Sequence, residues 1–568
     1  MMMAICQLST GTSIIHLHCT AQSVKTRTNS ISHLSLCIYT AALLCSTVFS
    51  KSTTTMAPHL NPSPDFKNVL LWSVPLLIIA PTVIFLYMQA VGNKKSGIRL
   101  PPSPLRLPII GHLHLMVHEP HRSLQRLARS LGPVVHLQLG GVAAIVVSSP
   151  EAAKEVLKTH DVHCCSRPSS PGAKLITYGQ QDIAFSPYNA SWRERRKLFV
   201  SELVSSKRVQ SFAYALEAQV GELIQSLSLR SLPTEPVNLN ETLFTLIDGF
   251  IGTVAFGSMH GAKLMKYAKF QQVFSEAMVA LSAFSAQDFF PASPMSRWFD
   301  KLIGLEARYQ RIFLELDSYF EMVLSQHMDP GRVKPDKDDL VDVLISLWKR
   351  EGKVTKDHLK ALLMDAFIGG TTTSSVTLLW AMSELIKNPT VMKKAQVEIR
   401  SSVSSKQSLV QVDDLPKLNY LKMVIKETLR LHPPAPLLVP RETMDHVKVL
   451  GYNIPSKTRI FVNVWAMGRD PACWDKPEEF YPERFEGIDT DFCGSHYELL
   501  PFGAGRRICP AIPMGATIVE FTLASLLHSF DWELPDGTRK EDVSMEGTGR
   551  QVFCRKTPLY LVPSFYTG

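Results

Sequence analysis

The residues with the clearest chemical potential in this chain lie near its C-terminus, around Cys509. The run FGAGRRIC ends at this cysteine, with Arg507 two positions and Phe502 seven positions before it. A cysteine thiolate is a strong ligand for iron, and as an axial ligand of haem it pushes electron density onto the metal so that an O–O bond can break. Gly503 and Gly505 permit a tight turn whose backbone N–H groups face the sulfur. A buried structural thiol is the alternative interpretation.

The same run resembles the haem-binding signature of the cytochrome P-450 family, which has Phe, Gly, Arg and Cys at the positions of Phe502, Gly505, Arg507 and Cys509. The resemblance implies that Cys509 is the metal ligand of a haem b group (iron protoporphyrin IX) and that Arg507 neutralises a haem propionate. Ala511 stands where the family usually has glycine. We expect this one additional methyl group to leave haem binding intact.

A second motif pairs a carboxylate with guanidinium groups. Glu427 and Arg430 are three positions apart in a predicted helix, so they share a face on which they can pair. Taken alone, such a pair is typical of a solvated surface. The later run FYPERF (480–485) resembles the P-450 segment whose arginine, here Arg484, completes a buried Glu-Arg-Arg network. We therefore expect Glu427, Arg430 and Arg484 to form a structural network that takes no part in chemistry.

A third motif is the run WRERR, in which Trp192 and Arg196 lie four positions apart and share a helix face. In the P-450 resemblance, both side chains reach a haem propionate. A half-buried amphipathic anchor is the simpler interpretation of a tryptophan on a basic helix.

A fourth motif lies in a long helical pattern at residues 357–385. Gly369 and Gly370 are adjacent in its interior, where each costs about 1 kcal/mol relative to alanine. Without side chains they let a flat ligand lie against the helix, and a hydroxyl can take an i−4 carbonyl out of the ladder. This resembles the oxygen-binding kink of the P-450 long helix, with Thr373 as the threonine that donates a hydrogen bond to bound oxygen. A Gly/Thr helix packed closely against a neighbour is the alternative.

Proton delivery must differ from the usual family pattern, because the family commonly has Asp or Glu just before that threonine, whereas this chain has Thr372. A hydroxyl is not a net proton source at neutral pH. We therefore interpret Thr372 and Thr373 as the catalytic pair and expect Thr371, Thr372 and Thr373 to order a chain of water molecules.

Composition agrees with one large catalytic domain. The 568 residues are 45% hydrophobic and 20% charged, and the motifs must meet at one site. The ten cysteines show no paired zinc-type spacing, which favours a reducing compartment. The resemblance implies a mainly α fold with a small β region around one haem, over residues 112–568.

The N-terminal part predicts a membrane anchor. Residues 69–88 carry no charge and are long enough to span a bilayer, and Lys94, Lys95 and Arg99 follow. We assign 56–100 to the anchor and basic patch and 101–111 to a proline-rich hinge. Residues 1–55 contain no Asp or Glu, which is typical of a transit peptide. We favour instead a mis-assigned start, with translation beginning at Met56.

The resemblance implies a plant A-type, microsomal haem-thiolate monooxygenase, with its catalytic domain on the cytosolic side of the endoplasmic reticulum and a plastid as second choice. It implies O2, and electrons from NADPH through a separate NADPH–cytochrome P-450 reductase, since the chain has no flavin or nicotinamide fingerprint. We expect membrane lipid but no nucleic acid as a partner. The expected substrate is a lipophilic small molecule of plant specialised metabolism, first a (di)terpenoid, then a phenylpropanoid or fatty acid. A haem-thiolate isomerase or dehydratase without O2, and a haem-binding protein without turnover, stay open.

Overall fold

The computed structural model describes residues 99–229, 235–257, 264–282, 284–351, 354–403, 409–548 and 552–567. The candidate span 69–88, the extension 1–55 and most of the basic patch lie outside the described residues. All the elements below belong to one compact unit that covers Ala90–Gly568. They are mainly helical, as the resemblance implies, with a small β region.

The long helix α17 (Lys356–Lys387) organises this unit, and its bounds agree closely with the sequence prediction. Its N-terminus is capped by Thr355, whose hydroxyl accepts the backbone N–H of His358 at 3.2 Å. Among the described residues, α17 is also the one helix long and apolar enough to cross a membrane, yet most of it is buried inside the protein. Its apolar composition therefore reflects a position in the core.

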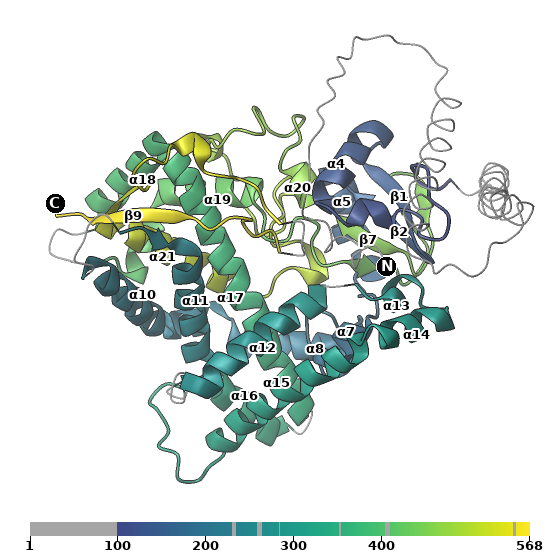
Figure 1. Cartoon of the computed structure of the whole chain (residues 1–568), viewed down its shortest axis with the longest axis horizontal. Helices are drawn as coiled ribbons and strands as arrows, with labels where there is room; N and C mark the ends of the chain where they lie inside the picture. The colour runs from purple at the N-terminus through teal and green to yellow at the C-terminus, as the bar shows by residue number, and fades with distance from the viewer. Residues whose placement is uncertain are drawn as a thin grey trace, which may run out of the picture. The chain divides into compact units, whose positions relative to one another are not determined.

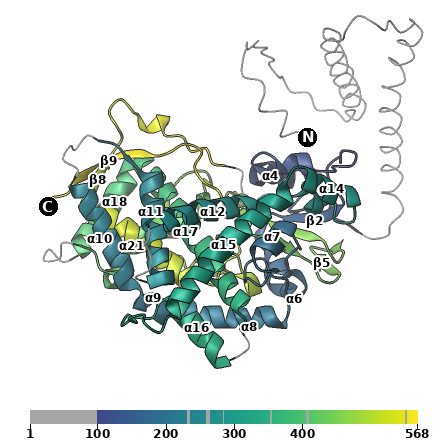
Figure 2. The ribbon, with the colours of Figure 1, turned by 60° about the horizontal axis from the view of Figure 1, so that its bottom comes forward.

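Other helices pack along α17, with α11, α16, α18, α19 and α21 in contact with it. Figure 1 shows α17 in the middle of the helical part with α11 beside it, and Figure 2 shows the same arrangement after a turn of 60°. The remaining helices are α4 (Pro120–Leu131), α5 (Pro150–Lys154), α6 (Asp161–Cys164), α7 (Pro171–Ile176), α8 (Ala190–Leu198), α9 (Ser206–Ser211), α10 (Ala213–Ser228), α11 (Leu239–Phe256), α12 (Leu264–Ser282), α13 (Ala286–Phe289), α14 (Pro294–Leu302), α15 (Leu305–His327), α16 (Leu340–Glu351), α18 (Pro389–Ser402), α19 (Asn419–Leu431), α20 (Val464–Met467) and α21 (Ile512–Ser529).

The strands form a four-stranded sheet in the order β1-β2-β7-β4, a three-stranded sheet in the order β3-β9-β8, and the hairpin β5-β6. In the larger sheet, β2 and β7 are parallel and the other pairs are antiparallel. The tight β1–β2 turn contains Gly140, whose φ of +61° suits glycine. The strands are β1 (Val134–Leu139), β2 (Val142–Val147), β3 (Val237–Asn238), β4 (Arg441–Glu442), β5 (Val447–Val449), β6 (Tyr452–Ile454), β7 (Arg459–Val462), β8 (Phe530–Glu533) and β9 (Tyr560–Phe565).

The structure brings Glu427, Arg430 and Arg484 together. The Arg430 guanidinium donates to both carboxylate oxygens of Glu427, at 2.7 and 2.8 Å, and Arg484 Nε donates to the same carboxylate at 2.9 Å. The backbone N–H of Tyr481 donates to it as well. Arg430 also donates to the carbonyls of Pro477 and Glu479. These bonds attach α19 to the loop 475–481, and each buried charge has partners.

We predict that Glu427→Gln lowers the free energy of unfolding by about 3 kcal/mol, because two buried guanidinium groups lose their counter-charge. Denaturant unfolding monitored by circular dichroism measures the loss. The matched control is Lys394→Ala, which removes the exposed ion pair between Lys394 and Glu483 and costs less than about 1 kcal/mol. Equal losses in the two variants would contradict the structural role of the network.

Candidate functional site

A cavity of about 340 Å³ lies between α17 and the loop that carries Cys509. Its walls are mostly apolar side chains from many parts of the chain. Ile251 and Val254 of α11 contribute on one side, and Leu438 and Val439, which follow α19, contribute on another. This size and lining are typical of a site for a small apolar molecule.

Cys509 lines this cavity immediately before α21 and after the short 3-10 helix η7 (Gly505–Arg507). Its backbone N–H donates to the carbonyl of Phe502 at 3.0 Å, which closes the loop. Burial raises the pKa of the Cys509 thiol, while the backbone N–H of Ala511 and the charge of Arg196 act in the opposite direction. The thiol therefore needs a positive partner, such as a metal ion, to become a thiolate.

Gly505 is the glycine that this loop requires. Its φ is +68°, and a methyl group at its Cα would lie 2.2 Å from the backbone oxygen of Leu157. Gly503 also has a positive φ, of +70°, but a methyl group there would meet only Leu438, at 3.5 Å. Close approach of the η7 backbone to Leu157 thus accounts for Gly505, and backbone conformation alone accounts for Gly503.

Arginines dominate the charge of the cavity. Arg167, Arg196, Arg441 and Arg507 line it, and Asp365 is the one acidic side chain among its described lining residues. Burial lowers the pKa of Arg167, and repulsion from Arg507 and Arg441 adds to this effect. Burial likewise lowers the pKa of Arg507 to about 9. The walls thus carry an excess of positive charge that an anionic ligand would stabilise.

Arg507 bonds to three backbone carbonyls, those of Cys165 at 2.8 Å, Ile183 at 3.0 Å and Ser186 at 2.6 Å. Its guanidinium also lies 3.9 Å from the centre of the Trp192 ring. Trp192 Nε1 donates to the same Ile183 carbonyl, at 3.0 Å. Trp192 is buried and is not among the lining residues, so in this structure it holds the segment 182–186 and does not face the cavity.

Arg196 lies one turn further along α8, lines the cavity, and donates to the Ile508 carbonyl next to Cys509. The structure therefore places Arg196 beside the cysteine loop, and its guanidinium also lies 5.7 Å from the centre of the Trp192 ring, so the two side chains share a helix face as predicted. Arg441, on β4, pairs with Asp161 at 2.8 Å and donates to the Ala504 carbonyl at 2.7 Å.

The two glycines of α17 have different surroundings. A methyl group at Gly369 would meet no atom within 4 Å, whereas one at Gly370 would lie 2.6 Å from Cδ1 of Ile251. Gly369 thus keeps a groove open on the cavity side, and Gly370 permits close packing against α11. Thr373 lines the cavity, and its hydroxyl donates to the Gly369 carbonyl at 2.6 Å. The helix is continuous through this region.

Thr371 and Thr372 are not among the residues that line the cavity. Thr371 is completely buried. The expected chain of three threonine hydroxyls therefore reaches the cavity through Thr373 alone, and a water chain along all three has no support in this geometry.

These residues fit a haem group. One sulfur ligand faces a mostly apolar cavity, the groove at Gly369 leaves room for a flat ring, and four guanidinium groups surround the cavity, which suits a ligand with two carboxylates. Arg507 and Arg196 would turn from backbone carbonyls toward those carboxylates, and Cys509 would bind the metal.

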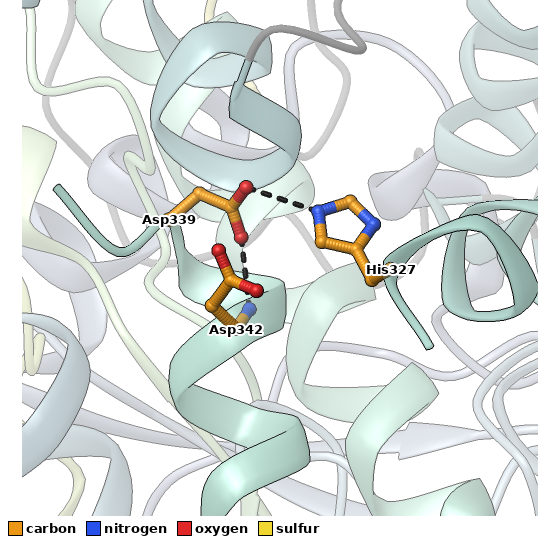
Figure 3. Close-up of side chains that lie close together, drawn as sticks. All are labelled: His327, Asp339 and Asp342. Atoms are coloured by element: carbon orange, nitrogen blue, oxygen red, sulfur yellow. Dashed lines mark hydrogen bonds and ion pairs between the residues drawn. The ribbon is translucent and has the colours of Figure 1, made fainter. Parts of the chain in front are cut away.

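A separate cluster, His327, Asp339 and Asp342, has donor atoms close enough to hold a metal ion. Figure 3 shows His327 directed at Asp339, and Asp339 accepting the backbone N–H of Asp342. Arg332 already neutralises the site, since it donates to Asp342 at 2.6 and 3.1 Å and to Asp339 at 3.3 Å. The cluster is an ion-pair network that attaches the end of α15 to the start of α16.

The sequence alone did not identify three functional candidates, namely Arg167, Arg441 and Asp365. Arg167 and Arg441 carry no local signal, because they reach the cavity only through tertiary structure. Asp365 did carry one: it lies four residues before Gly369 and eight before Thr373, and so on the same helix face. The 3.6-residue period of the helix could have identified it.

Comparison with known proteins agrees with this geometry. The family model described as Cytochrome P450 matches residues 101–562. The chain is 51% identical to 4-hydroxyphenylacetaldehyde oxime monooxygenase of Sorghum bicolor, over 87% of this chain and 96% of that protein. It is 46% identical to 2-methylbutanal oxime monooxygenase of Manihot esculenta, over 88% of this chain and 97% of that protein.

Solved structures agree on the fold. A zebrafish cytochrome P450 with progesterone superposes with a TM-score of 0.66 at 24% identity, covering 79% of this chain and 99% of that one. The cysteine loop, the grooved long helix and the arginine-lined cavity thus occur together in a chain that matches the family over nearly its whole described length, and this protein is a plant member of the cytochrome P450 family, a monooxygenase.

Proposed function

We propose that this monooxygenase inserts one oxygen atom from O2 into a small, mostly apolar aldoxime, with electrons from NADPH delivered by a separate reductase. The observation that carries the proposal is the similarity to two oxime monooxygenases over nearly their entire length. One of these relatives acts on an aromatic oxime and the other on an aliphatic one, according to their names. The apolar cavity of this chain is compatible with either kind of side chain.

Haem, when bound, supplies the site at which O2 is activated. The protein's own residues do the rest. The apolar walls exclude water from the substrate, Cys509 supplies the sulfur ligand, and Arg196 and Arg507 supply positive charge for the haem carboxylates. Thr373 places a hydroxyl on the cavity side of the groove at Gly369. These are the roles that we propose for the predicted site residues.

The aldoxime proposal replaces the terpenoid as first choice of substrate. The terpenoid expectation rested on the apolar character of the pocket, which does not distinguish a hydrocarbon from any other lipophilic molecule. An aldoxime adds a polar N–OH group, and Ser374 and Thr377 of α17 place hydroxyl groups among the lining residues. A polar head with an apolar body fits this combination.

We also propose that the protein is held at the endoplasmic reticulum membrane rather than in a plastid, by the candidate span 69–88 and by a second contact through α14. Met295, Trp298 and Leu302 lie on one face of α14 and are exposed by 75, 63 and 65%. Arg297 and Lys301 on the same helix would favour an anionic lipid surface.

The proline-rich hinge 101–111 supports a membrane contact at α14, because the hinge lies against the β1–β2 turn and this turn also contacts α13, just before α14. The Ile110 carbonyl accepts the N–H of Gly140, and the neighbouring Gly141 donates to the carbonyl of Phe289 in α13, just before α14. Leu105 and Ile109 in the hinge are themselves exposed by 87 and 79%. Apolar side chains of the hinge and of α14 thus lie near the same β1–β2 turn.

The substrate prediction concerns a small panel of compounds. Purified protein with a plant reductase should convert an aromatic or aliphatic aldoxime only when NADPH and O2 are both present, as measured by mass spectrometry of the product. A terpenoid hydrocarbon and a fatty acid serve as comparison substrates. Turnover of the terpenoid alone would contradict the aldoxime, and conversion of a hydroperoxide without NADPH would favour an isomerase or dehydratase. Binding without any NADPH-dependent product would favour a protein without turnover.

The ligand prediction is that Cys509→His abolishes the thiolate-type absorption of the reduced carbon monoxide complex while some haem stays bound, because imidazole donates less charge to iron than thiolate does. Optical spectroscopy measures the change. Cys164→Ser is the control, since Cys164 is buried away from the cavity, and it should leave the spectrum unchanged. Persistence of the thiolate band in Cys509→His would disprove the assignment.

The membrane prediction separates the two contacts. A chain that begins at Met56 should bind membranes stably, and one truncated through Lys95 should bind anionic phosphatidylcholine/phosphatidylserine vesicles weakly. In the truncated chain, Trp298→Asp should remove most of the remaining binding in a flotation assay, because a charge replaces an exposed apolar side chain. Leu314→Asp, an exposed position on α15, is the control. An equal loss of vesicle binding in both variants would mean that α14 makes no specific contact with the membrane.

A further inference from the structure

The cavity side of α17 carries an acid that the sequence motif does not include. Asp365, Gly369 and Thr373 follow each other at intervals of four residues, and all three line the cavity. The eight residues from Asp365 to Thr373 correspond to about 12 Å along the helix axis. A methyl group at Gly369, between them, would meet no atom within 4 Å, so the groove has room for water. Asp365 is the one acidic side chain among the described lining residues.

The surroundings of Asp365 contain a second carboxyl group. Asp365 accepts the backbone N–H of Ile183 at 2.6 Å and approaches that of Ala184 at 3.4 Å. Asp182, the residue before Ile183, is buried and accepts the N–H of Phe185 at 2.7 Å and the hydroxyl of Thr177 at 3.0 Å. Neutral donors thus satisfy both acids in these contacts, and neither acid forms an ion pair within the described part of the chain.

Few charges compensate this pair of acids. Arg195 on α8 attracts Asp365, but its guanidinium donates to Ser186 and Ser191 and contacts the ring of His358. Arg507 attracts Asp182 from the cysteine loop, while donating to three carbonyls. Burial raises the pKa of both acids, and repulsion from Asp182 raises that of Asp365 further. Two neighbouring buried carboxyls cannot both ionise readily.

We propose that Asp365 shares a proton with Asp182 at neutral pH and passes it, through water in the groove at Gly369, to the hydroxyl of Thr373. Asp365 acts here through Thr373 and is a positioning and proton-holding residue of the monooxygenase. The inference rests on the monooxygenase reaction and on the cavity position of Thr373, and it does not depend on the identity of the substrate.

The proton balance follows from the reaction. In each turnover one atom of O2 enters the product and the other becomes water, which consumes two electrons and two protons, and the reductase supplies the electrons. The O–H group of Asp365 gives its proton to water in the groove. The water passes this proton on to Thr373 Oγ1. The remaining carboxylate recovers a proton from solvent, and a second transfer of the same kind supplies the second proton of the turnover. The carboxyl pair is thereby regenerated without net change.

This assignment also explains how the chain functions without an acid at Thr372. Thr372 does not line the cavity and carries no acid. Asp365 supplies a titratable group on the correct face, two helical turns earlier. The alternative is that Asp365 only attaches the segment 182–186 to α17 by its hydrogen bonds.

The test compares Asp365→Asn, Asp365→Glu and Asp182→Asn with the control Asp300→Asn. Asp300 is a buried aspartate outside the cavity that also accepts two consecutive backbone N–H groups, those of Ala286 at 2.8 Å and Gln287 at 3.0 Å. Each variant is first shown to bind haem with the thiolate spectrum. A loss caused only by broken backbone hydrogen bonds would appear in Asp300→Asn as well.

The first measurement is the infrared carbonyl band of a protonated carboxyl group at pH 7, recorded without substrate. The band should be present in the wild type, absent in Asp365→Asn and unchanged in Asp300→Asn. Retention of every protonated-carboxyl band in Asp365→Asn would overturn the proposal. Because no substrate is present, an incorrect substrate class does not affect this result.

The second measurement is the product and peroxide formed per NADPH, as a function of pH, with any substrate that the enzyme converts. In the wild type the product yield should fall as the pH rises through the pKa of the pair, because the shared proton is lost. Asp365→Asn should reduce product formation about 10-fold, raise peroxide and remove this pH dependence, and Asp365→Glu should partly restore both.

Asp182→Asn provides the sharpest distinction from a purely structural role. Without repulsion from Asp182, Asp365 ionises at lower pH, so the midpoint of the product yield should move to lower pH. An unmoved midpoint, or full coupling in Asp365→Asn, would overturn the proposal.

Discussion

The cavity depends on the placement of four arginine guanidiniums around one mostly apolar space. A buried charge is costly unless hydrogen bonds satisfy it, and backbone carbonyls provide most of those bonds here. Arg507 alone joins Cys165, Ile183 and Ser186 to the cysteine loop. The loops around the cavity are therefore held by the same side chains that give it positive charge. Repulsion among these arginines makes a ligand with two carboxylates favourable, which is the charge that haem carries.

Two glycines near the site permit close packing between neighbouring segments of the fold. Gly505 lies against the Leu157 carbonyl, and Gly370 lies against Ile251, so neither position has room for a side chain. Gly369 has the opposite role, because its missing side chain leaves the groove open. The buried ion pairs of Glu427 hold α19 on the loop 475–481. Close packing at Gly370 and Gly505 thus accompanies an open groove at Gly369.

Sequence reasoning predicted the bounds of α17 within two residues from local spacing. It took the mainly helical fold and the meeting of Cys509, Thr373 and the glycines from the family resemblance, since these segments lie far apart in the chain. It could not place Arg167 or Arg441, since their approach to the cavity depends on how distant segments pack. It also expected Trp192 to act at a haem carboxylate, whereas here its indole N–H binds the Ile183 carbonyl. Thr372 was chosen by its position in a motif, and the helical period would have favoured Asp365.

The peptide group between Ile183 and Ala184 connects the acidic and the basic parts of the site. Its carbonyl accepts from Trp192 and Arg507, and its N–H approaches Asp365 at 3.4 Å. Hydrogen bonds at the two ends of one peptide group polarise each other in a low-dielectric interior. The charge that Arg507 directs at this carbonyl therefore strengthens the contact between the Ala184 N–H and Asp365. A ligand carboxylate that draws Arg507 away would weaken the same contact, so the cationic and acidic parts of the site respond to each other through this peptide group.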